Sequence, residues 1–142
     1  MNTLRRLLYR NMLLSVNQSK VGGSPNKAKP LLILCIIDCI EEGSVMDNKI
    51  LYDVIAQKYQ SHLSKMAGTI ARENYPFYFL TSDSFYHLKW KEIPIKTKAP
   101  SAKFIRDHIE YAYLDNALWD LLQKPEVRIE YRDLIINHYL TN

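Results

Sequence analysis

The chain has 142 residues, 47% of them apolar and 24% charged, with a formal net charge of +4 at pH 7. This size favours one globular domain with a single core and leaves too little chain for two ordinary domains. The longest apolar run, Leu31 to Ile37, has seven residues, which is too short for a transmembrane helix. Arg10 and Asn11 interrupt the N-terminal leucines, so we expect no signal peptide and a cytoplasmic location.

The basic residues are concentrated in two segments. Residues 1–37 contain six cations and no acid, and residues 85–106 contain six cations and one acid, whereas the remainder contains seven cations and fourteen acids. If the fold brings both segments together, one face is positive enough to attract a polyanion such as nucleic acid. The alternative is two solvated loops on different faces.

Helical periodicity dominates the first half of the chain. Apolar spacing predicts helices over residues 4–16, 31–40 and 47–65, with a loop over 17–29 that contains Gly22-Gly23-Ser24-Pro25. Pro30 suits the first turn of the second helix, and Gly43 suits its C-terminal cap. This second helix is apolar nearly all round, which predicts a central buried position.

The periodicity of the apolar residues changes after Gly68. Aromatic and other β-forming residues predict strands over 75–80 and 85–90, joined as a hairpin across Ser82-Asp83-Ser84. A basic loop over 92–102 and a short third strand over 109–114 follow. Asp115 can cap a helix that runs through Leu122, and Pro125 can open a last helix that runs through Tyr139.

These elements predict an α+β, mostly helical fold. Three helices followed by a hairpin favour a winged-helix-like helical domain with a small antiparallel β-sheet. We expect residues 1–142 to form one DNA-recognition domain, in which residues 1–25 supply an N-terminal helix and a basic loop, and no nuclease domain is present.

The sequence offers little catalytic chemistry. Cys35 and Cys39 lie four residues apart on one face of an apolar helix, which predicts two buried free thiols rather than a zinc site. The four histidines are scattered without metal-ligand spacing, and no phosphate-binding glycine loop or nucleophile–base pairing stands out. We therefore expect no metal, no cofactor and no enzymatic activity.

Three segments, taken in order, carry a family resemblance. The segment Asn26-Lys27-Ala28-Lys29-Pro30, which runs into aliphatic residues 31–34, is followed by Tyr75-Pro76-Phe77 and by the ending Ile135-Ile136-Asn137-His138-Tyr139-Leu140. In order and spacing the chain resembles the sulfur-binding domain of modification-dependent HNH restriction endonucleases, which recognises phosphorothioate DNA. The resemblance implies double-stranded, phosphorothioated DNA as the partner, and a nuclease supplied by a fused domain or another protein.

The resemblance also implies a site. Its sulfur pocket maps onto Tyr75 and Pro76, with Phe79 as a wall, and its phosphate-binding cations map onto Lys27 and Lys29. A second loop completes the pocket at 96–101, from which we select Lys96, Lys98 and Ser101. Ala28 departs from the pattern, because many members have histidine there, and this departure bears on the sulfur preference.

A physical argument supports such a pocket independently. Sulfur is softer than the oxygen that it replaces and accepts hydrogen bonds poorly, so an apolar cup admits sulfur and penalises oxygen by about 1–3 kcal/mol. The alternative structural interpretation is that Tyr75-Pro76-Phe77 simply begins a core strand. The alternative function is a winged-helix-like regulatory domain that binds unmodified DNA or a protein. A homodimer and the flanking base preference stay open.

Overall fold

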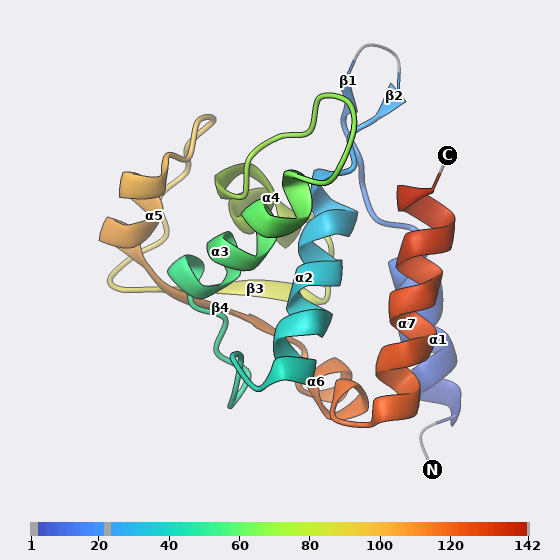
Figure 1. Cartoon of the computed structure of the whole chain (residues 1–142). Coiled ribbons are helices and arrows are strands. Elements are labelled where there is room, and N and C mark those ends of the chain that lie inside the picture. The colour runs from blue at the N-terminus through green and yellow to red at the C-terminus, as the bar shows by residue number, and fades with distance from the viewer. Residues whose placement is uncertain (1–2, 22–23, 142) are drawn as a thin grey trace.

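Helix α2 (Ala28–Glu42) lies at the centre of the computed structural model, which describes residues 3–21 and 24–141 (Figure 1). Twelve of its fifteen residues are buried, so the helix contacts protein on every side, as its all-round apolar sequence predicts. Because α2 touches α3, α4 and α7, it fixes the relative positions of the other elements.

Both ends of α2 are set by local sequence. The Asn26 Oδ1 atom accepts a hydrogen bond from the Ala28 backbone N–H at 2.9 Å, which satisfies one of the free donors of the first turn. Pro30 follows in that turn, where its missing N–H removes no helical hydrogen bond. At the other end Gly43 adopts a left-handed conformation with φ of 81°, which confirms it as the C-terminal cap.

Helices α1 (Thr3–Leu13) and α7 (Pro125–Ile135) run side by side on one flank of α2, and α6 (Asn116–Leu122) leads into α7 (Figure 1). Arg6 joins α1 to α7 twice, through a 2.6 Å contact with Glu130 and through its carbonyl, which accepts from the Tyr131 hydroxyl at 2.6 Å. The helices predicted near residues 4–16, 115–122 and 125–139 are confirmed. The last one continues past Ile135 as a π-helical turn, Ile136–Leu140.

The other flank carries α3 (Tyr52–Leu63), α4 (Asn74–Phe79), α5 (Ala102–His108) and an antiparallel sheet (Figure 1). Strand β3 (Tyr86–Trp90) pairs with β4 (Ile109–Leu114), with Tyr86 opposite Leu114 and a bulge at Lys89/Trp90. A second, two-residue pairing joins β1 (Lys20–Val21) to β2 (Ser24–Pro25). Of the loop predicted over 17–29, Gly22 and Gly23 lie outside the described residues. The mostly helical α+β class with a small antiparallel sheet is confirmed.

The hairpin predicted over residues 75–90 is wrong. Residues 74–79 form helix α4 and residues 80–82 a 3₁₀ turn, so the first predicted strand does not exist, and β3 pairs with the later strand β4 instead. Tertiary packing explains the difference, because Phe77 and Leu80 are both fully buried and three residues apart, which suits a helical turn. The ring of Phe77 meets that of Tyr52 edge-on at 5.1 Å, and its carbonyl accepts from the Tyr86 hydroxyl at 2.6 Å.

The third helix begins later than the predicted residue 47. Asp47 and Asn48 have positive φ angles of 57° and 54°, which a right-handed helix does not contain. Both amide-group atoms of the Asn48 side chain bond the backbone of Leu114, and the backbone of Ile50 exchanges two hydrogen bonds with that of Ala112. These residues therefore extend the sheet beside β4 instead of starting α3.

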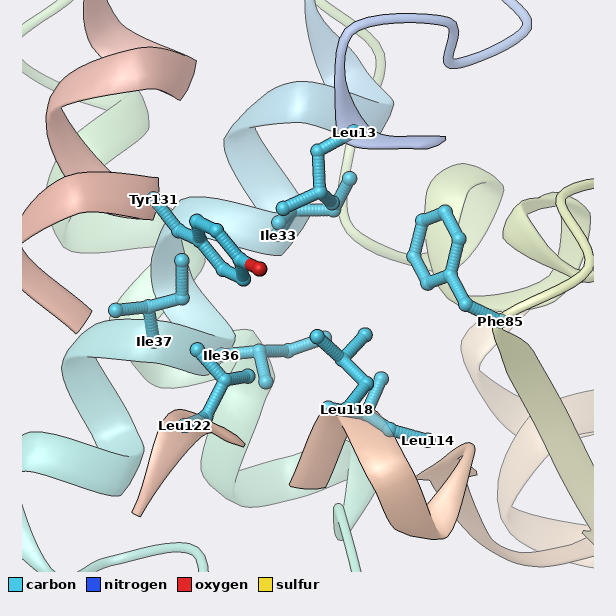
Figure 2. Close-up of a pocket in the computed structure, with 9 residues that line it drawn as sticks. All are labelled: Leu13, Ile33, Ile36, Ile37, Phe85, Leu114, Leu118, Leu122 and Tyr131. Carbon is cyan, nitrogen blue, oxygen red and sulfur yellow. The ribbon is translucent and has the colours of Figure 1, made fainter. Parts of the chain in front are cut away.

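The core closes tightly where α1, α2, α6 and α7 meet. A cavity of about 10 Å³ remains there, and Figure 2 shows its lining side chains, which include Leu13, Ile36, Leu118 and Tyr131. Such a volume approaches the minimum for one water molecule, and its apolar lining makes it a packing defect rather than a binding site. Cys35 and Cys39 are buried free thiols, as predicted, and burial raises the pKa of both.

Candidate nucleic-acid interface

Helix α4 presents an aromatic surface. The rings of Tyr75 and Phe79 are half-buried and lie 4.8 Å apart between centroids, inclined by 45°. They share one face because residues four apart align on a helix. Pro76, which the sequence places in the sulfur pocket, is buried, as is Phe77 next to it in the chain. Of the three α4 residues predicted for the sulfur pocket, Tyr75 and Phe79 are therefore the ones with accessible surface.

The basic loop between β3 and α5 is fastened to α4. The Asn74 side-chain amide donates to the Pro100 carbonyl at 2.7 Å. The Tyr78 hydroxyl donates to the Ile95 carbonyl at 3.0 Å and accepts from the Thr97 backbone N–H at 3.2 Å. These bonds hold residues 95–100 against the helix that carries the aromatic surface, so the structure brings together two segments that the sequence places twenty residues apart.

Within this loop the predicted site residues are accessible. Lys96 and Lys98 are both exposed. Ser101 is also exposed, and its Oγ atom accepts from the Phe104 backbone N–H at 3.0 Å, which makes it the N-cap of α5. Its hydroxyl hydrogen is not used in that bond and is available to an acceptor.

Lys27 and Lys29 have different environments although both lie at the start of α2. Lys27 is half-buried at the N-cap position. Lys29 has a side chain only 9% exposed, and its Nζ atom donates to Ser82 Oγ at 2.8 Å and lies 3.6 Å from Asp83 Oδ2. The Asp83 side chain, 6% exposed, also accepts from the Asn17 backbone N–H at 3.1 Å. Lys29 therefore connects α2 to the segment after α4.

The β1–β2 hairpin is positioned beside the same helix. The Tyr75 hydroxyl donates to Ser19 Oγ at 3.3 Å, and the Asn26 backbone N–H donates to the Ser19 carbonyl at 2.6 Å. Lys20 follows Ser19 directly and is exposed. In Figure 1 this hairpin lies at the end of the molecule where α2 begins, next to the segment that joins α3 to α4.

That connecting segment contributes cations that the sequence did not assign to the site. Lys65 and Arg72 are exposed, and Arg72 immediately precedes the buried Glu73 at the start of α4. Their position before the Tyr-Pro-Phe motif is the available signal, but a strand over residues 75–80 does not indicate where these cations lie relative to the rings. Asn74 and Tyr78 were missed because their hydrogen bonds to the loop depend on tertiary structure.

The two basic segments come together only in part. Lys20 follows Ser19, whose Oγ accepts from Tyr75 of α4, and Lys27 is the N-cap residue of α2. Arg6 and Arg10 lie instead on α1 and contact Glu130 of α7 at 2.6 and 3.6 Å. The resulting surface combines half-exposed aromatic rings with cations on three surrounding loops, an arrangement that suits a polyanion with an apolar part. Across residues 3–21 and 24–141, no three potential metal ligands gather, and no helix is long and apolar enough to span a membrane.

Comparison with models of protein families gives no match, and comparison with curated protein sequences gives none either. Solved structures do match. The sulfur-binding domain and SRA domain of ScoMcrA, complexed with phosphorothioated DNA, aligns with a TM-score of 0.75 and 16% identity over 93% of this chain. The sulfur-binding domain of SprMcrA, also complexed with phosphorothioated DNA, aligns with a TM-score of 0.72 and 16% identity over all of this chain and 90% of its own.

The structure of a larger protein also matches this chain. The Type IV phosphorothioation-dependent restriction endonuclease ScoMcrA aligns with a TM-score of 0.72 and 18% identity. This chain spans 29% of that endonuclease and 42% of the structure that holds the sulfur-binding and SRA domains. The chain therefore has the fold of a sulfur-binding domain, at sequence identities that establish the fold alone.

Proposed function

We propose that this chain is a DNA-binding module that recognises phosphorothioate-modified double-stranded DNA in the cytoplasm. The observation that carries the proposal is the shared fold: over 92–100% of its length the chain superimposes on domains whose structures were solved with phosphorothioated DNA. Fold does not by itself give function. The proposed function is therefore also supported by the aromatic and basic residues that this chain places around α4.

The sulfur contacts the surface formed by Tyr75 and Phe79. A sulfur atom loses little when it leaves water for an aromatic surface, and sulfur–ring contacts are favourable by about 0.3–1.5 kcal/mol. A phosphate oxygen in the same place would forfeit hydrogen bonds to water. Pro76 has a structural role and does not contact the sulfur, because its fixed φ sets the first turn of the helix that carries both rings.

The surrounding cations supply affinity without discrimination. Lys96 and Lys98 are exposed on the loop held by α4, and they contact backbone phosphates together with Lys27 at the start of α2. The free hydroxyl hydrogen of Ser101 donates to a neighbouring phosphate. Lys29 has a positioning role instead, because its ammonium group is buried against Ser82 and Asp83.

Recognition, rather than catalysis, is the activity we assign to residues 1–142, which act as one domain. In modification-dependent restriction the cleavage step would then fall to a nuclease domain, fused or separate. The similarity to about a third of a Type IV restriction endonuclease supports this division of labour.

Fluorescence polarisation with two matched duplexes, one of which carries a single phosphorothioate, tests the proposal. If the oxygen penalty of about 1–3 kcal/mol applies, the modified duplex binds more tightly by roughly 5-fold to 150-fold. Equal affinity for both duplexes would refute sulfur recognition and favour a binder of unmodified DNA. Absence of binding to either duplex at low salt would refute the nucleic-acid function.

A further inference from the structure

The outer face of α1 is apolar and exposed. Leu4, Leu7 and Leu8 have exposed fractions of 80%, 51% and 49%, although the same helix buries Tyr9 and Leu13 on its inner side. Residues 4, 7 and 8 are spaced i, i+3 and i+4, so they form one continuous stripe along the helix. A stripe of this kind on a small domain marks a contact surface.

The neighbouring helix α7 exposes acids, and its arginines Arg128 and Arg132 pair with Glu41 and Asp38 of the same molecule. Arg5 and Arg10 border the leucine stripe of α1; Arg10 lies 3.6 Å from Glu130 of the same molecule, so Arg5 is the arginine that a partner copy can meet. On α7, Ile129 is 62% exposed, and it lies between the exposed acids Glu126 and Asp133 in the sequence. Helices α1 and α7 run side by side (Figure 1), so the leucine stripe of α1 and the exposed Ile129, Glu126 and Asp133 of α7 belong to neighbouring helices.

We propose that the α1–α7 surface is a self-association interface whose occupant is a second copy of this chain. A two-fold axis between the helices places α1 of each copy on α7 of the other, so the leucine stripe covers Ile129 and Arg5 approaches Glu126 and Asp133. Direct packing of α1 on α1 would instead bring arginines together, which is unfavourable. The α1–α7 surface is thus complementary to a second copy of itself in both its apolar residues and its charges.

The dimer leaves the candidate nucleic-acid interface open. Helix α4 and the loop before α5 lie on the opposite flank of α2 from α1 and α7 (Figure 1). One dimer therefore presents two DNA-binding faces, and simultaneous use of both raises the apparent affinity for DNA with two modified positions. Self-association itself needs no DNA, so it is tested separately from the proposed function.

Sedimentation equilibrium of the whole chain over a concentration series tests the interface. We expect a monomer–dimer equilibrium, weakened on the order of tenfold by each of Leu4→Gln and Leu7→Gln, because each removes a buried apolar side chain from the dimer. Met46→Gln is the matched control, since Met46 is 66% exposed on the loop after α2. A monomer at every concentration, or equal effects of control and leucine variants, would overturn the proposal.

Charge reversal tests the arrangement within the dimer. Arg5→Glu in one chain, or Glu126→Lys with Asp133→Lys in another, should each weaken the homodimer. A mixture of the two variants should regain the dimer, because each altered helix then meets a partner helix of opposite charge. Failure of the mixture to associate while the wild type dimerises would refute packing of α1 on α7.

Discussion

The buried contact between Lys29 and Asp83 makes the proposed positioning role of Lys29 testable. Replacing Asp83 by Asn leaves the ammonium group of Lys29, with a side chain only 9% exposed, beside a neutral partner and Ser82. Breaking one side of a buried ion pair typically costs about 3–5 kcal/mol. Since the Nζ–Oδ2 distance is 3.6 Å and Ser82 remains, we expect a loss near the lower limit, about 3 kcal/mol.

Replacing Lys29 by Met should have a smaller effect. The Asp83 carboxylate would still accept from the Asn17 backbone N–H, so its charge keeps one hydrogen bond, and we expect a loss of about 1–2 kcal/mol. In the double variant neither charge is left unpaired, so its loss should be smaller than the sum of the two single losses.

Urea unfolding followed by circular dichroism measures all three variants, with Lys96→Met as the matched control because Lys96 is exposed. If Asp83→Asn changed the free energy of unfolding by less than about 0.5 kcal/mol, as surface substitutions do, the pair would not hold the interface together. Lys29 would then return to the set of candidate phosphate contacts.

Further predictions concern the lysines, the aromatic surface, the tyrosines and the thiols. Lys96→Ala and Lys98→Ala should each weaken binding to modified and unmodified duplexes by similar factors and lower the salt slope by about one, whereas Lys124→Ala should leave both unchanged; an effect on sulfur preference alone would contradict phosphate contact. Phe79→Ser should reduce the preference for the modified duplex while circular dichroism shows an intact fold, and an unchanged preference would show that this ring does not face the sulfur. Burial, with Asp115 beside the hydroxyl, raises the pKa of Tyr9 to about 12, and burial likewise raises that of Tyr131 to about 12. The unfolded chain therefore loses these protons first, and stability should fall as pH rises from about 10 to 12; a flat stability profile across that window would argue against the raised pKa values. Cys35 and Cys39 should react with a thiol reagent only on unfolding, and rapid labelling of the native protein would contradict their burial.

Elements whose sequence signal is local were predictable. Helix α2 contains the longest apolar run of the chain, Leu31 to Ile37, between Pro30 and Gly43, and the structure confirms both ends. Strand β4 follows its alternating pattern over Ile109–Leu114. Pro125 opens α7 because proline suits the first turn of a helix wherever it occurs.

Elements that depend on contacts with residues distant in the sequence were not predictable. The residues of α4 favour strands intrinsically, and their helical conformation follows from burial of Phe77 and Leu80. Helix α5, of seven residues, was not predicted; it begins at the end of the predicted basic loop and includes the residues that follow. Lys29 was assigned to phosphate because no sequence pattern reveals that Asp83, fifty-four residues later, lies beside it.

The candidate site likewise has parts that the sequence predicts and parts that depend on tertiary contacts. Its segments were identified by short motifs and by charge, and the structure brings α4 and the loop with Lys96 and Lys98 together. Their attachment through Asn74 and Tyr78 is a tertiary feature that no local pattern encodes. The burial of Pro76 likewise became visible only once α4 was seen to be a helix.

Amide chemical-shift mapping with the two matched duplexes tests the central claim most directly. Both duplexes should shift signals from the β1–β2 hairpin, the segment before α4 and residues 95–101, because these surround the phosphates. The difference between the two duplexes should be confined to residues 74–80, where the sulfur meets the aromatic surface. A difference centred on any other element, or none at all, would contradict sulfur recognition by α4.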